Sequence, residues 1–502
     1  MPTPTTTTDV LIVGAGPVGL FLANQCARRS LRWRIVEQRA GQSEHSKALG
    51  IMPRTLEIFD MAGIVGPFLE AANRVHSVAV LAHGRRLAEI EFAAAESPYP
   101  FIAMVPQDVT EALLVRALKQ KGGSVDYETS FVSAAQDDHG VDAVLELRSE
   151  RFAVRASYVV GCDGAHSAVR HQLGLPFEGA EYHTTFMLAD TETNDALRGD
   201  ELHLCPHEDG PLALFPMSRT RRRIVATVAG TGDGDAPSLG LVRSMLEQRG
   251  PHGIEARSLN WSTYFHVHHR QVARMQVGRT FVAGDAAHIH SPFGGQGMNT
   301  GLQDAWNLAW KLDLVIRGRA RPELLDSYTA ERQPVIRHVV ETTDFITKAL
   351  GTPSRFAQGI RNVMIPLVSR LAPFQHAFVQ TLSELGVDYH GSPIVDGAGR
   401  RYFDEWLRDG RAFGRRFTLL VDTDESPSTL AEARRLIGDF SDVLELRLGV
   451  RQGLALVRPD GYLAYESRGE ATSGALASVR EVLERQVVSS RSGDAHALSR
   501  SR

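Results

Sequence analysis

Three glycines and one acid near the start of the chain have the spacing of a nucleotide-binding turn. Gly14, Gly16 and Gly19 follow a short apolar run and open a helix-forming segment, and Glu37 ends a second apolar run. Gly14 allows a tight turn, Gly16 allows close approach of a diphosphate, and Gly19 allows the helix and the strand to touch. An acid at the position of Glu37 binds ribose hydroxyls. The diphosphate faces the N–H groups at the helix start. The sequence therefore predicts a dinucleotide site, and a glutamate at the ribose position favours FAD or NAD over NADP.

A second glycine-rich segment lies far along the chain, before a strongly helical run at 298–316. Gly284 and Asp285 end a predicted strand at 280–283, and a Pro/Gly loop at 291–297 opens the helix. Such a loop exposes N–H donors at the positive end of a helix, which suits a developing anion. Asp285 suits a sugar diol. This segment is expected to return to the first sheet and to face the same ligand.

Three polar residues lie where predicted strands or helices begin and end. Asp163 ends a short buried strand beside a helix, which is a ligand-facing position in open α/β sheets. Gln107 starts a helix, where it points towards a ligand or caps the helix. Lys47 flanks the nucleotide crevice, with solvated surface charge as the alternative.

Residues 177–269 change to strand-like runs and predict a second, mainly antiparallel sheet against a few helices. One face of this sheet could roof a pocket, and an ordinary core is the alternative for each of its side chains. The candidate pocket residues are Phe186, Phe215, Met217, Trp261 and Tyr264.

Composition limits the class of protein. The 502 residues carry 55 basic and 59 acidic side chains, so no nucleic-acid stripe is expected. The three cysteines are widely spaced without C-x-x-C, which predicts no disulfide framework and no metal site and fits a reducing cytoplasm. No apolar run is long enough to span a bilayer, and the N-terminus lacks the features of a signal peptide.

The motifs resemble those of the FAD-dependent aromatic hydroxylases, the p-hydroxybenzoate and phenol hydroxylase family. The likeness rests on GAGPVG, CDGAHSAVR and GDAAHIHSPFGGQGMNTGLQDAWNLAWKL, and it extends to about residue 340. The C-terminal LALVRPDGYLAYE hairpin, in a β-α-β-β-α order, resembles the thioredoxin-like domain of phenol hydroxylase-type members, without C-x-x-C.

The resemblance implies an α/β fold with five parts. These are a Rossmann-like FAD-binding domain at 1–176 with a strand insert at 75–103, an inserted substrate domain at 177–269, a second FAD-binding part at 270–395, a thioredoxin-like domain at 396–488 and a disordered tail at 489–502. The implied cofactor-binding residues are Gly14, Gly16, Pro17, Val18, Gly19, Glu37, Lys47, Gln107, Asp163, Gly284, Asp285, Pro292, Gly295, Gly297, Met298 and Asn299. Lys47 stands where many members have arginine, which keeps the charge and loses the planar fork.

The implied reaction uses FAD, transient NADPH or NADH, O2 and a small aromatic substrate. Reduced flavin forms a C4a-hydroperoxide that transfers oxygen to a phenolic or other electron-rich ring. Tyr264, His266 and His288 are candidates for a base that removes a phenolic proton, by residue type alone. A homodimer is possible, and neither nucleic acid nor a membrane is expected as a partner.

Three alternatives remain. A Baeyer–Villiger or epoxidising member of the same family, acting on a polyketide-like substrate, has the same motifs. A flavin-dependent halogenase is disfavoured because no W-x-W-x-I-P segment occurs. A non-catalytic nucleotide-binding protein would be colourless or would not consume NAD(P)H.

Overall fold

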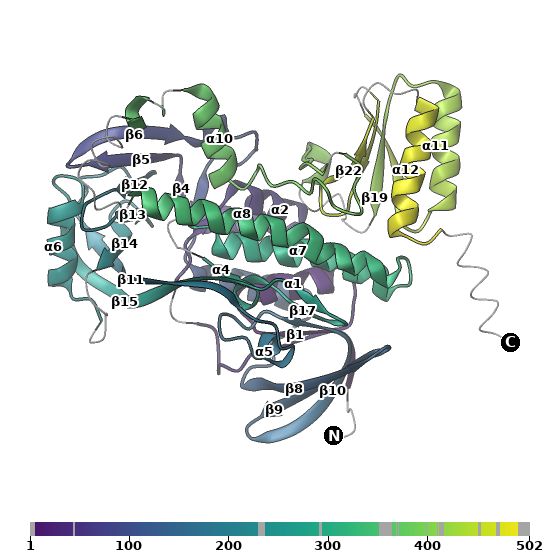
Figure 1. The fold of residues 1–502 in the computed structure, drawn as a ribbon, viewed down its shortest axis with the longest axis horizontal. Coiled ribbons are helices and arrows are strands. Elements are labelled where there is room, and N and C mark those ends of the chain that lie inside the picture. The colour runs from purple at the N-terminus through teal and green to yellow at the C-terminus, as the bar shows by residue number, and fades with distance from the viewer. Residues whose placement is uncertain are drawn as a thin grey trace.

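The fold is that of a computed structural model. It describes residues 6–43, 46–228, 236–290, 294–350, 364–367, 369, 371–397, 399–408, 410, 416–449, 453–467 and 472–489. Pro292 and residues 490–502 of the expected tail lie outside this part of the chain. Figure 1 shows two large sheets with long helices between them and a smaller C-terminal unit at one end. No helix in the described residues has the length and apolar composition needed to cross a membrane.

The first sheet carries the N-terminal glycine motif. Its central strands are parallel: β1 forms parallel pairs with β2 and with β10, and β10 forms a parallel pair with β17. The chain returns to this sheet at residues 280–282, as expected for 280–283, before it adds a last short strand at 288–289 to the second sheet. The strands are β16 (Gln276–Val277), β17 (Thr280–Val282), β10 (Glu150–Gly161), β1 (Thr6–Val13) and β2 (Trp33–Val36), with β9 (Gly140–Leu147) and β8 (Thr129–Asp137) added on β10.

Helices cover the first sheet and separate it from the rest of the molecule. Helix α1 (Pro17–Arg28) packs against α4 (Gln107–Gln120) and α7 (Gly297–Ile316), which runs through the centre of Figure 1. Nearly every side chain of α7 is buried. Helix α8 (Ser327–Leu350) lies beside α7 and continues through Pro334.

The second sheet has eight strands and an almost entirely antiparallel register. One face packs on α6 (Leu239–Arg249), and the other includes residues that contact α10 (Ala372–Leu382). The strand order is β18 (His288–Ile289), β15 (Ala256–Gln271), β11 (Glu178–Thr193), β14 (Arg221–Val228), β13 (Leu212–Pro216), β12 (Glu201–Cys205), β5 (Ser77–Ala82) and β6 (Arg85–Glu91).

The strand insert at 75–103 requires a correction to the expected domain limits. We placed it within the first domain, but β5 pairs in parallel with β12 and so extends the second sheet. The pairing joins segments more than 120 residues apart, and nothing in the local pattern of either strand specifies it.

Shorter elements connect the two sheets. A three-stranded sheet consists of β3 (Gly50–Ile51), β7 (Ile102–Met104) and β4 (Asn73–Val75). Three further helices are α2 (Pro53–Met61), α3 (Val65–Ala71) and α5 (Ala168–Gln172).

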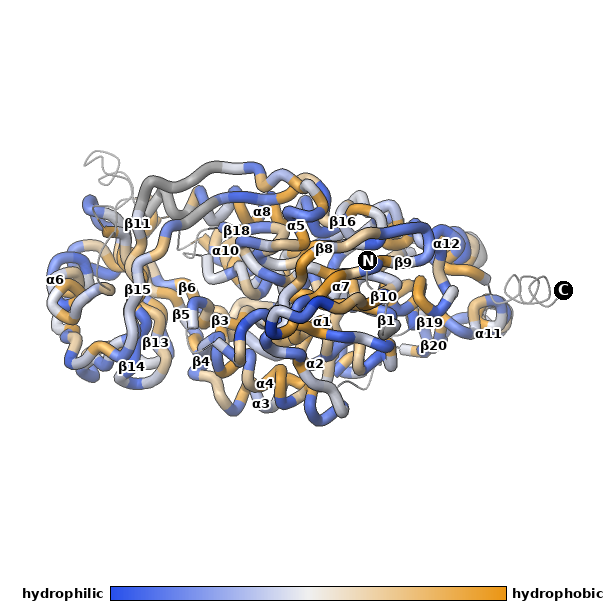
Figure 2. The backbone as a smooth tube through the Cα atoms, turned by 90° about the horizontal axis from the view of Figure 1, so that it is seen from below, coloured by the Kyte–Doolittle hydropathy of each residue, from blue (hydrophilic) through white to orange (hydrophobic). Residues whose placement is uncertain are grey.

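The C-terminal unit follows the β-α-β-β-α order expected from the sequence. Strand β19 pairs in parallel with β20 and antiparallel with β21. The assignment of the C-terminal unit to the thioredoxin-like class stays a prediction. Figure 2 shows this unit at one end of the elongated molecule and α6 at the other. Its elements are β19 (Phe417–Asp422), α11 (Pro427–Asp439), β20 (Leu444–Gly449), β21 (Leu454–Val457), β22 (Leu463–Glu466) and α12 (Thr472–Gln486).

Candidate active site

The glycine turn after β1 divides its three glycines between packing and an open space. A Cβ on Gly14 would lie 2.4 Å from the Cys162 carbonyl oxygen, and one on Gly19 would lie 2.0 Å from that of Gly14. A Cβ on Gly16 would meet nothing within 4 Å, and Gly16 lines a cavity. Helix α1 begins here without a side-chain cap. The turn thus has the tight packing and the open helix start that a bound diphosphate needs.

The Glu37 carboxylate lies at the same turn, where it is buried and does not line the cavity. Its Oε2 accepts a hydrogen bond from the Ala15 amide at 2.8 Å, and its Oε1 accepts one from Arg39 Nε at 3.0 Å. Burial alone would raise the pKa of this carboxyl, but the hydrogen bonds from Arg39 and Ala15 hold it below the ordinary value. Glu37 is therefore an ionised acceptor, as ribose binding requires.

The second glycine segment packs directly on the first. A Cβ on Gly284, whose φ is +60°, would lie 2.9 Å from Val18 Cγ2, and one on Gly301 would lie 2.7 Å from the same atom. The two motifs, more than 260 residues apart, therefore form adjoining walls of one site, as the sequence predicted.

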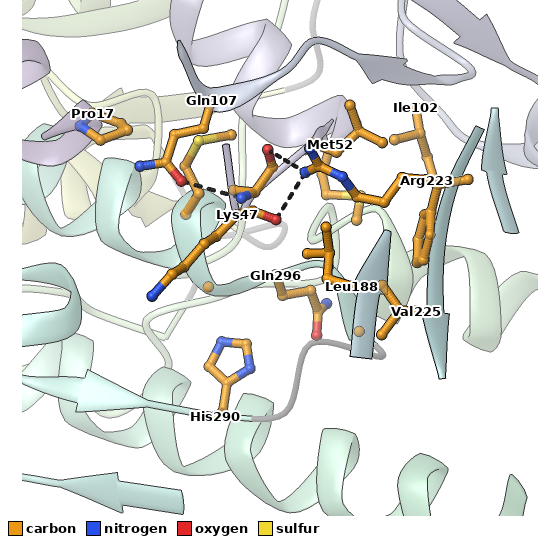
Figure 3. Close-up of a pocket in the computed structure, with 18 of the residues that line it drawn as sticks. Pro17, Lys47, Met52, Ile102, Gln107, Leu188, Arg223, Val225, His290 and Gln296 are labelled. Atoms are coloured by element: carbon orange, nitrogen blue, oxygen red, sulfur yellow. Dashed lines mark hydrogen bonds between the residues drawn. The ribbon is translucent and has the colours of Figure 1, made fainter. Parts of the chain in front are cut away.

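One cavity of about 380 Å³ connects the two motifs with the second sheet. Figure 3 shows it between Pro17 and Gln107 on one side and Leu188 and Val225 on the other. Nine of the predicted cofactor residues line it: Gly16, Pro17, Val18, Lys47, Gln107, Asp285, Gly295, Gly297 and Met298.

Polar groups gather at the glycine-rich end of the cavity. The Gln107 side chain accepts a hydrogen bond from the Ala48 amide at 3.1 Å, and Lys47 extends its side chain into the cavity (Figure 3). Asp285 also lines the cavity, yet the protein around it raises the pKa of its carboxyl through desolvation, against the opposing charges of His288 and Lys47.

Two other predicted cofactor residues act on the backbone around the cavity. Asp163 accepts hydrogen bonds from Ser167 Oγ at 2.5 Å and from the Val169 amide at 3.1 Å, so its carboxylate faces the start of α5. Asn299 accepts one from the Met52 amide and donates to the Gly50 carbonyl oxygen, which ties the short β3 sheet to α7. Neither side chain lines the cavity.

The three candidate bases do not line the cavity. Tyr264 packs with the residues facing α6, and His266 follows on the same face of β15, whereas Thr263 and Phe265 line the cavity. Successive residues of a strand point to opposite faces of the sheet. Moving along β15 by one position therefore exchanges a side chain that faces the cavity for one that faces α6. His288 is buried, with Nε2 2.7 Å from Asp304 Oδ2, and does not line the cavity.

One of the five predicted pocket residues lines the cavity. Phe215 lines the cavity, and Phe186 lies behind it, with its ring 5.6 Å from that of Phe265. Met217 and Trp261 pack on the same side of the sheet without lining the cavity. Tyr264 lies on the opposite face of the sheet, among residues that pack on α6.

Sequence reasoning missed most of the apolar wall. The missed apolar lining residues that come from the second sheet and α10 are Val78, Leu188, Leu202, Leu204, Val225, Phe265, Ile289, Phe378 and Leu382. Alternation along β12 and β14 was a usable signal, because their cavity-lining residues, Leu202 with Leu204 and Arg223 with Val225, are two positions apart. Nothing local indicated that α10 would cover this face.

Arg223 is a missed charge on the cavity wall. Its guanidinium forms two hydrogen bonds with Asp190, at 2.7 and 2.9 Å, and donates to the Lys47 and Ala48 carbonyl oxygens at 3.0 and 3.2 Å (Figure 3). Both side chains are buried, so the Asp190 carboxylate neutralises the charge of Arg223 at the cavity wall. Arg223 also ties the second sheet to the loop that carries Lys47.

These features define a flavoprotein fold, with a dinucleotide site continuous with an apolar chamber. The family described as FAD binding domain matches residues 7–343. The 6-methylpretetramide 4-monooxygenase of Streptomyces rimosus is 32% identical over 93% of this chain and 92% of its own. The pentachlorophenol 4-monooxygenase of Sphingobium chlorophenolicum is 31% identical over 66% and 63%.

A solved structure shows the same relationship. The anhydrotetracycline hydroxylase OxyS from Streptomyces rimosus superposes with a TM-score of 0.77 at 28% identity, over 96% of this chain and 99% of that one. The chain belongs to the FAD-dependent aromatic hydroxylases and is a flavoprotein monooxygenase.

Proposed function

We propose that this enzyme uses NADPH or NADH to hydroxylate a phenolic or other electron-rich aromatic compound held in the apolar half of the cavity. The observation that carries the proposal is the continuity of the cavity. Its polar end is lined by Gly16 and Asp285, and the same continuous cavity is lined at its apolar end by Phe215, Phe265 and Phe378. A cofactor at one end and an aromatic ring at the other would therefore meet.

The glycine-rich end fits FAD. Gly16 and the uncapped start of α1 would receive the diphosphate, and the ionised Glu37 would accept hydrogen bonds from the ribose. Asp285 would contact the ribityl chain, and Gly297 and Met298, at the start of α7, would flank the ring. When bound, FAD supplies hydride acceptance and the activation of O2.

The protein's own contribution is orientation, exclusion of water and stabilisation of charge. The N–H groups at the positive end of α7 would stabilise negative charge on the reduced ring. The apolar side chains of the second sheet and of α10 would keep water from the reacting atoms. Tyr264, His266 and His288 do not line the cavity, so none of them would remove a substrate proton directly.

A substrate screen tests this function. The yellow holoenzyme is mixed with NADPH or NADH and a panel of phenols and polycyclic phenols, and NAD(P)H oxidation and product mass are recorded. We expect a subset to accelerate oxidation and to give a product heavier by one oxygen atom, labelled when 18O2 is supplied. Acceleration by none of the phenols, or peroxide as the sole product, would contradict the proposal. The product structure separates ring hydroxylation from Baeyer–Villiger insertion or epoxidation.

A further inference from the structure

A buried carboxylate on α7 joins the two cofactor-facing segments. Asp304 Oδ2 accepts hydrogen bonds from the Gly284 amide at 3.1 Å and from His288 Nε2 at 2.7 Å. Its other oxygen, Oδ1, accepts one from Arg332 Nε at 2.7 Å. All three side chains are almost completely buried.

Two of these donors belong to the segment that forms one wall of the cavity. Asp285, Ile289 and His290 line the cavity from this segment, and its backbone leaves the first sheet at Gly284. Asp304 itself lies on α7, whose first residues form the adjoining wall. One carboxylate therefore sets the distance between the two walls.

The carboxylate is ionised, which fixes the directions of all three bonds. Burial would raise its pKa, but the positive charge of Arg332 and the hydrogen bonds from His288 and Arg332 hold the pKa below the ordinary value. Arg332 is anchored in turn by the Tyr389 hydroxyl at 3.2 Å and the Thr300 carbonyl oxygen at 3.1 Å. A buried ion held on three sides has little freedom to move, so the turn it binds is equally fixed.

We propose that Asp304 is a positioning residue for the FAD ring, acting through the Gly284–Asp285 turn and His288. The proposal accounts for His288, which pairs with Asp304 and does not reach the cavity. An amide in place of the carboxylate has one acceptor oxygen, so its NH2 group would face either Arg332 or the Gly284 and His288 donors. One wall would shift relative to the other.

The test compares two buried acids of similar surroundings. In Asp304→Asn we expect the dissociation constant of FAD, titrated into the apoprotein by flavin fluorescence, to rise at least tenfold. The visible spectrum of bound flavin and its reduction potential should shift as well. The control is Glu331→Gln on α8, which removes a carboxylate bonded to Lys311 and Arg458 away from the cavity.

The control should lose thermal stability yet bind FAD within about twofold of the wild-type constant, with an unchanged spectrum. The proposal is overturned if Asp304→Asn changes FAD affinity and spectrum no more than Glu331→Gln does. If Asp304→Asn fails to fold, His288→Gln decides the matter, because it keeps the ion pair with Arg332 and removes the imidazole donor. We then expect a weakening of about threefold with a shifted spectrum, and an unchanged constant and spectrum would overturn the proposal.

Discussion

At the scale of single residues, Gly16 and Gly19 should separate cofactor binding from folding. A methyl group on Gly16 enters open space, at φ −74°, so Gly16→Ala should leave apoprotein stability within about 0.5 kcal/mol of the wild type. It should weaken FAD binding by about tenfold or more, because the methyl group occupies the approach to the diphosphate. Gly19→Ala should instead cost about 3 kcal/mol, because its Cβ meets the Gly14 carbonyl oxygen.

Urea unfolding of the apoprotein and FAD titration measure the two effects in the same preparations. The assignment of the diphosphate to this turn fails if Gly16→Ala binds FAD as tightly as the wild type does.

The Arg223–Asp190 pair should decide which substrate charge the cavity accepts. With Asp190 in place, the wall near Arg223 offers a carboxylate little net attraction, so a neutral phenol should bind more tightly than its carboxylated analogue. Asp190→Asn leaves Arg223 uncompensated, together with Arg221, which lies 3.8 Å from the Asp190 carboxylate. The variant should lose about 3–5 kcal/mol of stability and shift the affinity ratio towards the carboxylate by about tenfold.

Flavin difference spectra with 2-naphthol and 6-hydroxy-2-naphthoic acid measure this ratio. Asp195→Asn is the matched control, because the Asp195–Arg219 pair is exposed to solvent, which screens its charges. An unchanged ratio in Asp190→Asn would show that the wall near Arg223 does not select substrate charge.

At the scale of elements, Glu384 links the end of α10 to α7. Gln303 Nε2 donates to its carboxyl at 2.5 Å, and desolvation raises the pKa of Glu384 to about 8. The folded protein therefore holds this proton more tightly than the unfolded chain does. The associated stability is complete below about pH 4.5 and is lost as the pH rises towards 8, by a few kcal/mol.

Glu384→Gln is neutral at every pH, so the difference in unfolding free energy between wild type and variant should change over that interval. Thermal unfolding in buffers from pH 5 to 9 measures it, with the exposed Glu341→Gln as the control. A difference that stays constant with pH would contradict the protonated state assigned to Glu384.

Local patterns predicted the elements well and their faces poorly. Strand β17 at Thr280–Val282 lies within the expected limits of 280–283, and β1, α1 and β2 follow the expected order. These segments have strong apolar runs bounded by glycine or charge, which is local information. The face of β15 that carries Tyr264 was not determined locally, because both faces are covered, one by α6 and one by the cavity.

Contacts between distant segments account for the remaining differences. The Asp460–Gly461 pair was expected as a hairpin turn, but Asp460 is buried and accepts a hydrogen bond from Trp310 Nε1 at 3.0 Å. The adjoining Arg458 pairs with Glu331 of α8. No spacing rule connects positions 127 residues apart, so the sequence alone could not indicate that this turn is an anchor.

At the scale of the whole molecule, that anchor predicts that the C-terminal unit and α7–α8 unfold together. Arg458 donates to Glu331 at 2.6 and 2.9 Å and to Asp460 at 3.0 and 2.6 Å, and all three side chains are buried. Arg458→Met leaves two carboxylates without this partner in the interior, so it should cost about 3–5 kcal/mol.

Urea unfolding and limited proteolysis measure the consequence. Arg400→Met is the control, because Arg400 pairs with Glu466 at an exposed position and should contribute no more than about 1 kcal/mol. In Arg458→Met we expect a lower urea midpoint, because the hairpin no longer holds the C-terminal unit on α7. We also expect faster cleavage between residues 397 and 416, where the chain enters that unit. Equal midpoints and equal cleavage rates in the two variants would mean that the C-terminal unit is held by its apolar contacts with Trp310 and Leu314, and that the buried ions contribute little to its docking.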